Sequence, residues 1–269
     1  MTKIGFIGTG NMGRAMVRGL AGAGLYDKTD ILIYDRTFSV AEKLAAELGT
    51  TAVSDSSDLI RECQIIIFAV KPYVLPGLLA EKNTLLTGDK VIVSVAAGVS
   101  LVDIQTALGD DNRKIVRVMP NTPALVGTAM SSVTPNNAVS EAELAQVLAV
   151  FRSFGKAEVV PESLIDAVVG VSGSAPAYVY LFIEALADGA VLEGMPRAQA
   201  YEFAAQTVLG AAKMVLETGE HPGALKDMVT SPGGTTIAAV KVLEDTGFRA
   251  AVINAVAAAA QKNHEMGEK

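Results

Sequence analysis

Three glycines near the start of the chain have the spacing of a dinucleotide phosphate loop. Gly8, Gly10 and Gly13 form a G-x-G-x-x-G pattern between a short apolar run and a helical segment. In such a pattern the first glycine makes a tight turn, the second lets the backbone approach a pyrophosphate, and the third lets the helix pack against the strand. N–H groups at the helix start then face the phosphates. From the spacing alone, an ordinary glycine-containing turn is the alternative.

The elements on both sides of the glycines fit a dinucleotide-binding unit. The apolar run from Ile4 to Ile7 predicts a strand, and residues 11–20 predict a helix. A second strand, Ile31 to Tyr34, ends at Asp35 and Arg36, about twenty residues past the glycines, where such a unit meets the adenosine ribose. The acid is typical of a site for NADH and the arginine of a site for NADPH. A solvated turn is a third interpretation.

Three later apolar runs predict strands that are buried on both faces of a parallel sheet. They occupy residues 63–70, 91–95 and 115–119. Ligands of such a sheet bind outside the carboxyl ends of its strands, so Lys71, Gly98 and Asn121 should converge on the glycine loop. Alternatively, Lys71 only hydrates the end of a strand. Helices are expected at 39–48 and 141–154, and edge strands at 129–133 and 156–160.

The pattern changes near Pro161, and alanine-rich helical spacing then continues to the C-terminus. We place a domain boundary there. Helical faces with so few charged residues are often buried in a second subunit, and we therefore expect an oligomer. The expected helices are 164–171, 177–193, 197–218, 222–229, 236–245 and 249–265.

Two loops are expected to interrupt these helices and to determine specificity. They read V-S-G-S-A-P-A-Y at residues 171–178 and M-V-T-S-P-G-G-T-T-I at residues 228–237. Small hydroxyl side chains and backbone N–H groups at a helix start can form a neutral site for a carboxylate. A pair of helix-capping turns explains the same residues equally well.

Composition and charge exclude several classes of partner. The 269 residues include 22 Lys and Arg and 29 Asp and Glu, and the net charge of -7 argues against nucleic acid or an anionic membrane as the partner. No targeting segment is evident, and no uninterrupted apolar stretch reaches membrane-spanning length. The single cysteine, Cys63, is expected to be buried and inert, which suits the cytoplasm.

The sequence offers no metal site and no acid–base pair. His221 precedes Pro222 and is expected to cap a helix, while His264 is assigned a structural or solvent role in the C-terminal tail. No metal-ligand spacing accompanies either histidine, and we predict no bound metal. The two predicted loops contain no histidine, cysteine or buried carboxylate, so acid–base or nucleophilic catalysis has little support.

Six stretches together resemble the pyrroline-5-carboxylate reductase family. The last of them is much more specific than the glycine loop, and the resemblance covers nearly the whole chain. It implies an α/β protein with an N-terminal Rossmann dinucleotide-binding domain, residues 1–161, and a C-terminal all-helical substrate-binding and dimerisation domain, residues 162–269. The stretches are G-F-I-G-T-G-N-M-G at 5–13, A-V-K-P at 69–72, A-A-G at 96–98, M-P-N-T-P at 119–123, G-V-S-G-S-A-P-A-Y at 170–178 and H-P-G-A-L-K-D-M-V-T-S-P-G-G-T-T-I at 221–237.

The resemblance implies reduction of pyrroline-5-carboxylate to L-proline with NADPH or NADH, the last step of proline biosynthesis. It also implies a homodimer, and some members of the family assemble five dimers into a ring. The residues implied to contact the dinucleotide are Phe6, Ile7, Gly8, Thr9, Gly10, Asn11, Arg36, Ser56, Ala69, Val70, Lys71, Pro72, Ala96, Ala97 and Gly98. Those implied to hold the substrate are Ser231, Gly234, Thr235 and Thr236. Many relatives carry asparagine where Ser56 stands.

Arg36 favours NADPH as the cofactor, and Thr236 is the candidate for a hydrogen bond to the imine nitrogen of the substrate. Two alternative functions stay open. A Rossmann reductase of the hydroxyacid dehydrogenase type would need a G-x-x-x-K helix, whereas residues 210–214 read G-A-A-K-M. A non-catalytic dinucleotide-binding sensor would use the helical half only for contacts between subunits.

Overall fold

The computed structural model describes residues 3–267, and the chain forms two compact units. The first unit comprises residues 1–174 and 258–269, and the second comprises residues 175–257. Residues 162–174 and the last turns of the C-terminal helix therefore pack with the first unit, although the alanine-rich helical pattern of the sequence begins near Pro161. The division of the chain into functional domains at residue 161 stays a prediction.

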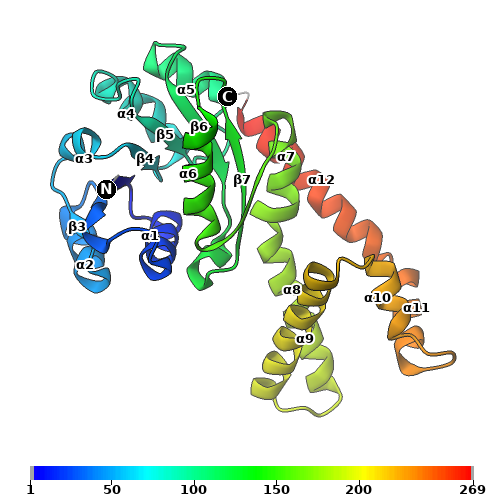
Figure 1. The fold of residues 1–269 in the computed structure, drawn as a ribbon. Coiled ribbons are helices and arrows are strands. Elements are labelled where there is room, and N and C mark those ends of the chain that lie inside the picture. Colours follow the sequence, from blue (N-terminus) through cyan, green and yellow to red (C-terminus); the bar gives the residue numbers. More distant parts are fainter. Residues whose placement is uncertain (1–2, 268–269) are drawn as a thin grey trace. The chain divides into compact units, whose positions relative to one another are not determined.

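Within the described residues, the first unit is built on an eight-stranded sheet of order β3-β2-β1-β4-β5-β6-β7-β8 (Figure 1). Neighbouring strands are parallel except β6 and β7, which form an antiparallel pair. The strands are β1 (Ile4–Ile7), β2 (Ile31–Tyr34), β3 (Thr51–Ala52), β4 (Ile65–Phe68), β5 (Val91–Ser94), β6 (Lys114–Met119), β7 (Ala129–Pro135) and β8 (Gly155–Val159).

Helices cover both faces of this sheet, which explains why its strands are apolar at consecutive positions. Alternate strand residues face opposite ways, so Phe6 lies in one apolar cluster and Ile7 in the other. The first cluster includes residues of α1 (Asn11–Ala23), α2 (Phe38–Leu48) and α6 (Glu141–Arg152). The second includes residues of α3 (Ser56–Glu62), α4 (Leu75–Lys82) and α5 (Leu101–Leu108).

The strands predicted from apolar runs are all confirmed, within a few residues at their ends, and so are α1, α2 and α6. The short strand β3 and the helices α3, α4 and α5 were not predicted. Cys63 is fully buried beside β4, and burial raises the pKa of its thiol to about 12. The expected burial of this cysteine is therefore confirmed, and a thiol of raised pKa is less reactive at neutral pH.

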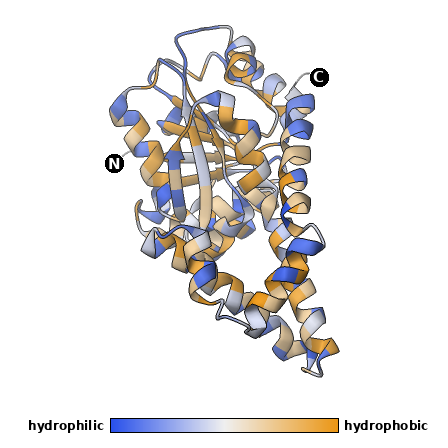
Figure 2. Cartoon of the chain, turned by 90° about the vertical axis from the view of Figure 1, so that its right-hand side faces the viewer, coloured by the Kyte–Doolittle hydropathy of each residue, from blue (hydrophilic) through white to orange (hydrophobic). Residues whose placement is uncertain are grey.

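The second unit consists of helices whose apolar side chains have few internal partners. Its core between α8 (Ala175–Leu192) and α9 (Arg197–Thr218) is small and includes Ala187, Ala200 and Ala204. Large apolar side chains such as Leu181 and Phe203 are 69% and 63% exposed, and Figure 2 shows apolar residues along these helices. The other helices are α10 (Pro222–Met228), α11 (Thr235–Asp245) and α12 (Phe248–Gly267), whose last turns belong to the first unit.

The loop expected at residues 171–178 is wrong. The chain there continues from α7 (Ile165–Val168) through a π-helical turn, Val169–Gly173, and α8 begins at Ala175. The N–H of Ser174 donates to the carbonyl of Val169 at 2.8 Å, so the wider turn keeps the backbone hydrogen-bonded through the Gly- and Ser-rich stretch.

This continuity corrects a second expectation. The helical stretch Glu162–Leu192 is long and apolar enough to cross a membrane by length and composition, whereas the sequence suggested no such stretch. The small and polar residues at positions 170–176 interrupt the apolar pattern but not the helix. A single stretch of this kind is weak evidence for a membrane span, because the core helix of a soluble protein can pass the same test.

Candidate functional site

The glycine loop has the geometry that its spacing predicts. Gly8 has a φ of 103°, a region that favours glycine, and a Cβ there would lie 2.7 Å from the carbonyl oxygen of Ala69. A Cβ on Gly13 would overlap the carbonyl oxygen of Gly8, so α1 can approach the loop only because position 13 has no side chain. A Cβ on Gly10 would meet no heavy atom within 4 Å. Gly10 therefore presents open backbone to a ligand.

The strand ends next to this loop bring the predicted dinucleotide residues to one edge of the sheet. Ile7 at the end of β1 is paired with Tyr34 of β2 and Phe68 of β4, and Phe68 is paired with Ser94 of β5. The segments that follow these strands therefore lie next to one another. They are 8–11, 35–36, 69–72 and 96–98, as predicted.

Several predicted residues can offer a ligand only their backbone. The side chains of Phe6, Ile7 and Thr9 are at most 1% exposed, and Ser56 is 3% exposed at the first position of α3. Lys71, by contrast, is exposed at the end of β4, and its amine makes no ion pair within residues 3–267. Backbone N–H groups with one exposed cation beside them suit a phosphate group.

Asp35 and Arg36 differ in the number of hydrogen bonds that their side chains make to the protein. The carboxylate of Asp35 accepts hydrogen bonds from Thr9 in the glycine loop. The exposed side chain of Arg36 has no hydrogen bond or ion pair with any other described residue. At this strand end the cation is therefore available to a ligand, whereas the acid is bound to the protein.

The side chain of Asn121 is hydrogen-bonded within the protein, and its expected approach to the glycine loop stays a prediction; the next residue, Thr122, lines a pocket together with Asn11 of α1. Its side-chain oxygen accepts from the N–H of Met130 at 2.9 Å, and its Nδ2 donates to the carbonyl of Ser172 at 3.2 Å. These bonds tie the end of β6 to the start of β7, which follows the 3-10 helix Thr122–Val126 and pairs with β6 in the antiparallel direction. Asn121 is 8% exposed, and these hydrogen bonds give its side chain a structural role.

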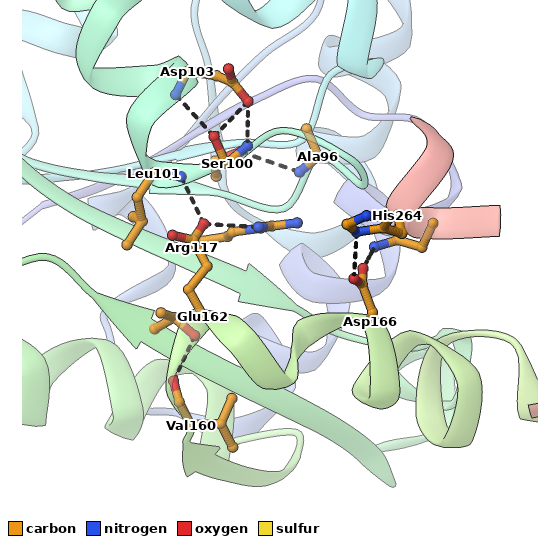
Figure 3. A network of polar contacts seen from close by, with 12 residues as sticks. Ala96, Ser100, Leu101, Asp103, Arg117, Val160, Glu162, Asp166 and His264 are labelled. Atoms are coloured by element: carbon orange, nitrogen blue, oxygen red, sulfur yellow. Dashed lines mark hydrogen bonds and ion pairs between the residues drawn. The ribbon is translucent and has the colours of Figure 1, made fainter. Parts of the chain in front are cut away.

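A polar network supports the predicted dinucleotide segment 96–98 from behind (Figure 3). Ser100 and Asp103 form a capping box at the start of α5. Glu162 accepts from the N–H of Leu101 at 2.8 Å and from the buried Arg117 at 2.8 Å. The network therefore fixes the backbone that follows the segment to β6.

The last turns of α12 also pack beside the segment 96–98. A Cβ on Gly98, whose φ is 71°, would lie 3.3 Å from Cβ of Met266. Asp166 accepts a hydrogen bond from Asn263 at 2.6 Å and lies 3.3 Å from Nδ1 of His264 (Figure 3). His264 therefore lies in a helix rather than in a tail, and its contact with Asp166 fits the expected structural role.

The predicted substrate residues lie together in the second unit, at the start of α11. Gly233 has a φ of 67°, and the N–H of Gly234 donates to the carbonyl of Ser231 at 3.1 Å. No described side chain caps α11, so the first N–H groups of the helix have no side-chain acceptor. Thr236 is half-buried and its hydroxyl has no partner among residues 3–267. The capping alternative is therefore wrong for α11.

The other candidate cap in this region is confirmed. Nδ1 of His221 accepts from the N–H of Gly223 at 3.1 Å, which caps α10. His221 therefore has a structural role at the helix that precedes the Ser231 loop. The helix start at Gly234 provides N–H donors and neutral hydroxyls, which suit a carboxylate.

Comparison with known proteins identifies the family. Pyrroline-5-carboxylate reductase of Escherichia coli (strain K12) is 54% identical over 266 residues, which cover 99% of this chain and 98% of that protein. This chain belongs to the pyrroline-5-carboxylate reductase family. The family model for pyrroline-5-carboxylate reductase dimerisation matches residues 162–266, and a model described as coenzyme F420-dependent NADP oxidoreductase matches residues 3–98.

Solved structures of the family have the same fold. A pyrroline-5-carboxylate reductase from Coxiella burnetii is 34% identical, with a TM-score of 0.93 over 100% of this chain and 99% of that one. The Plasmodium falciparum pyrroline carboxylate reductase, solved with NADP bound, is 33% identical, with a TM-score of 0.89 over 99% and 98% of the two chains. Membership of this family favours neither the hydroxyacid dehydrogenase nor the non-catalytic sensor.

The different surroundings of Gly13 and Gly10 predict different effects of the same substitution on stability. Gly13→Ala should lower the free energy of unfolding by about 1–3 kcal/mol, because the methyl group overlaps the Gly8 carbonyl. Gly10→Ala should change it by less than about 0.5 kcal/mol, because the methyl group enters open space at a φ of -63°. Urea unfolding of both variants measures the difference. Equal stability of the two variants would contradict the packing role of Gly13.

Proposed function

We propose that this chain reduces 1-pyrroline-5-carboxylate to L-proline with a nicotinamide dinucleotide, the last step of proline biosynthesis. The observation that carries the proposal is the full-length match, at 54% identity, to the Escherichia coli enzyme of that name. The glycine loop and the uncapped start of α11 supply the two kinds of binding site that the reaction needs, one for a pyrophosphate and one for a carboxylate.

NADPH is the proposed cofactor, with NADH as the weaker alternative. The backbone at Gly8, Gly10 and Ala96–Gly98 would cradle the dinucleotide, and a side chain at Gly8 would strike Ala69. Lys71 would add a positive charge near the phosphates, and the unengaged Arg36 would pair with a 2′-phosphate. When bound, the cofactor supplies the hydride. The relative solved with NADP supports this choice.

The substrate is a cyclic imine that bears a carboxylate. The N–H groups of Gly234 to Thr236 and the hydroxyl of Ser231 would hold the carboxylate, and these groups are neutral. The hydroxyl of Thr236 would hydrogen-bond to the ring nitrogen, which gains a proton during the reduction. Positioning of the ring is the main contribution of these residues, since none of them is a strong acid or base.

The exposed apolar faces of the second unit are proposed to be buried in a homodimer, which can assemble further into a ring of five dimers. The match to the dimerisation model over residues 162–266 supports self-association, and Leu181 and Phe203 are examples of side chains that a second copy would cover. We place the protein in the cytoplasm, with no membrane or nucleic acid as its partner. The net charge of -7 argues against nucleic acid and an anionic membrane as partners.

The direct test of the activity is oxidation of NADPH, followed by its absorbance, with and without pyrroline-5-carboxylate, together with chromatographic detection of proline. We expect oxidation that depends on the substrate and one proline for each NADPH consumed. Binding of NADPH without substrate-dependent oxidation would instead support the non-catalytic sensor. A parallel series with NADH measures the cofactor preference.

Arg36→Ala should raise KM for NADPH about ten- to a hundredfold, because a charged hydrogen bond to the 2′-phosphate contributes about 1.5–3 kcal/mol. KM for NADH should change less than about threefold, since NADH lacks that phosphate. Steady-state kinetics with both cofactors gives the comparison. Arg61→Ala is the matched control, because Arg61 is an exposed arginine of the same unit that pairs with Asp58. Equal effects of Arg36→Ala on both cofactors would refute the role.

Thr236→Ala should lower kcat about ten- to a hundredfold, because a hydrogen bond to a group that gains charge contributes about 1.5–3 kcal/mol in the transition state. Its melting temperature should stay near that of the wild type, since Thr236 does not cap α11. Thr246→Ala is the control at the other end of the helix, where Oγ1 donates to the Val242 carbonyl at 2.8 Å. It should cost stability but not turnover. Unchanged kcat in Thr236→Ala would remove Thr236 from the mechanism.

A further inference from the structure

The carboxylate of Asp35 accepts three hydrogen bonds from two residues of the first unit. Its Oδ2 accepts from the N–H of Thr9 at 2.9 Å and from Oγ1 of Thr9 at 2.6 Å. Its Oδ1 accepts from the N–H of Thr37 at 3.0 Å. Both oxygens of the carboxylate are therefore engaged, and the stronger set of contacts goes to the residue between Gly8 and Gly10.

Thr9 is the residue through which the glycine loop is fixed. It is 1% exposed, although it lies between two residues of an open turn. Its N–H and hydroxyl are bound by Asp35, and its carbonyl accepts from Nε of Arg14 at 2.9 Å. The preceding N–H, of Gly8, donates to the carbonyl of Tyr34 at 2.8 Å. The loop is therefore attached to the end of β2 on one side and to α1 on the other.

The charge of Asp35 is consistent with this arrangement. Partial burial would raise the pKa of the carboxyl group, but the hydrogen bonds from Thr9 and Thr37, together with the positive charge of Arg14, lower the pKa below its ordinary value. Asp35 is therefore ionised at neutral pH, and its hydrogen bonds to Thr9 are charge-assisted. A ribose hydroxyl would have to bind a carboxylate oxygen that already accepts at least one hydrogen bond.

We propose that Asp35 is a positioning residue, which holds the phosphate loop through Thr9 and accepts no hydrogen bond from the adenosine ribose, so that Arg36 alone distinguishes NADPH from NADH. This inference rests on the proposed dinucleotide-binding function. It departs from the usual role of an acid at this position, which is to bind the 2′-hydroxyl and to disfavour a 2′-phosphate. Because the pyrophosphate is common to both cofactors, a loop held in place by Asp35 serves both equally.

The test is direct binding of each nucleotide to the full chain, without substrate, measured by the change in nicotinamide fluorescence. Asp35→Asn should raise Kd for NADPH and for NADH by the same factor, about tenfold, because a charge-assisted pair becomes a neutral one. A rise confined to NADH, or tighter binding of NADPH, would show that Asp35 binds the ribose and would overturn the proposal. Asp27→Asn is the control, since it removes an exposed charge that is bonded to no described residue.

Substitutions at Thr9 test whether Asp35 acts through that residue. Thr9→Val should raise both Kd values by one common factor, and Thr9→Ser, which keeps the hydroxyl, should bind like the wild type. The double variant Thr9→Val, Asp35→Asn should bind no more weakly than the worse single variant, because both remove the same interaction. If the double variant instead raised Kd by the product of the two single factors, Thr9 and Asp35 would act independently, which would contradict the proposal. The Thr9 variants also provide the test if Asp35→Asn does not fold.

The two proposals can fail separately. Wild-type chain that binds neither nucleotide would overturn both of them. Binding of both nucleotides without reduction of pyrroline-5-carboxylate would overturn the proposed reaction only, since the Asp35 measurements use no substrate.

Discussion

The close contact between the start of α1 and the glycine loop is the constraint on which the dinucleotide site depends. Gly13 lies against the carbonyl oxygen of Gly8, at a separation that no other residue type permits. That contact turns the chain sharply from β1 into α1 and directs the open backbone at Gly10 outward. The neighbouring strands β4 and β5 end at the same level as β1, so their loops face the same place. The dinucleotide site is therefore formed jointly by the loops that follow several strands, and not by the glycine loop alone.

The glycines alone do not fix the loop, because residues with little steric restriction leave it free to move. Thr9 removes that freedom. Its three backbone and side-chain polar groups are bonded to Asp35 and Arg14, so the turn is held from both of the elements that flank it. A loop held in this way loses less entropy when it binds a pyrophosphate, which is the advantage of a preorganised site.

Much of the fold follows from the sequence because the strands of a parallel sheet are apolar on both faces. The runs around Ile66, Ile92 and Val116 could be recognised for this reason. The helices α3, α4 and α5, which were missed, have only seven or eight residues each, too few for a clear helical period; α10 is equally short and was recognised from His221 and Pro222 at its start. The loop expected at residues 171–178 was wrong because Gly, Ser and Pro predict a break, while a π-helical turn keeps the chain helical.

The order in which the loop segments follow the strands was predictable from the sequence, whereas the polar contacts of these segments were less so. Segment positions follow from strand ends, whereas the partner of a side chain depends on three-dimensional neighbours that the sequence does not specify. The bonds of Asn121 to Met130 and Ser172, and of Asp35 to Thr9, are examples of contacts that the sequence did not indicate. Glu162 and Arg117, which support the backbone after Gly98, gave no recognisable motif.

The central claim is that the acid at the end of β2 organises the loop while the adjacent arginine binds the 2′-phosphate. A crystal structure of the full chain with NADPH tests it most directly, through the distances from Asp35 and Arg36 to the cofactor. The account predicts that Oδ2 of Asp35 remains within hydrogen-bonding distance of the N–H of Thr9 and that the guanidinium of Arg36 contacts the 2′-phosphate. A carboxylate turned to a ribose hydroxyl, with Arg36 in solvent, would contradict it.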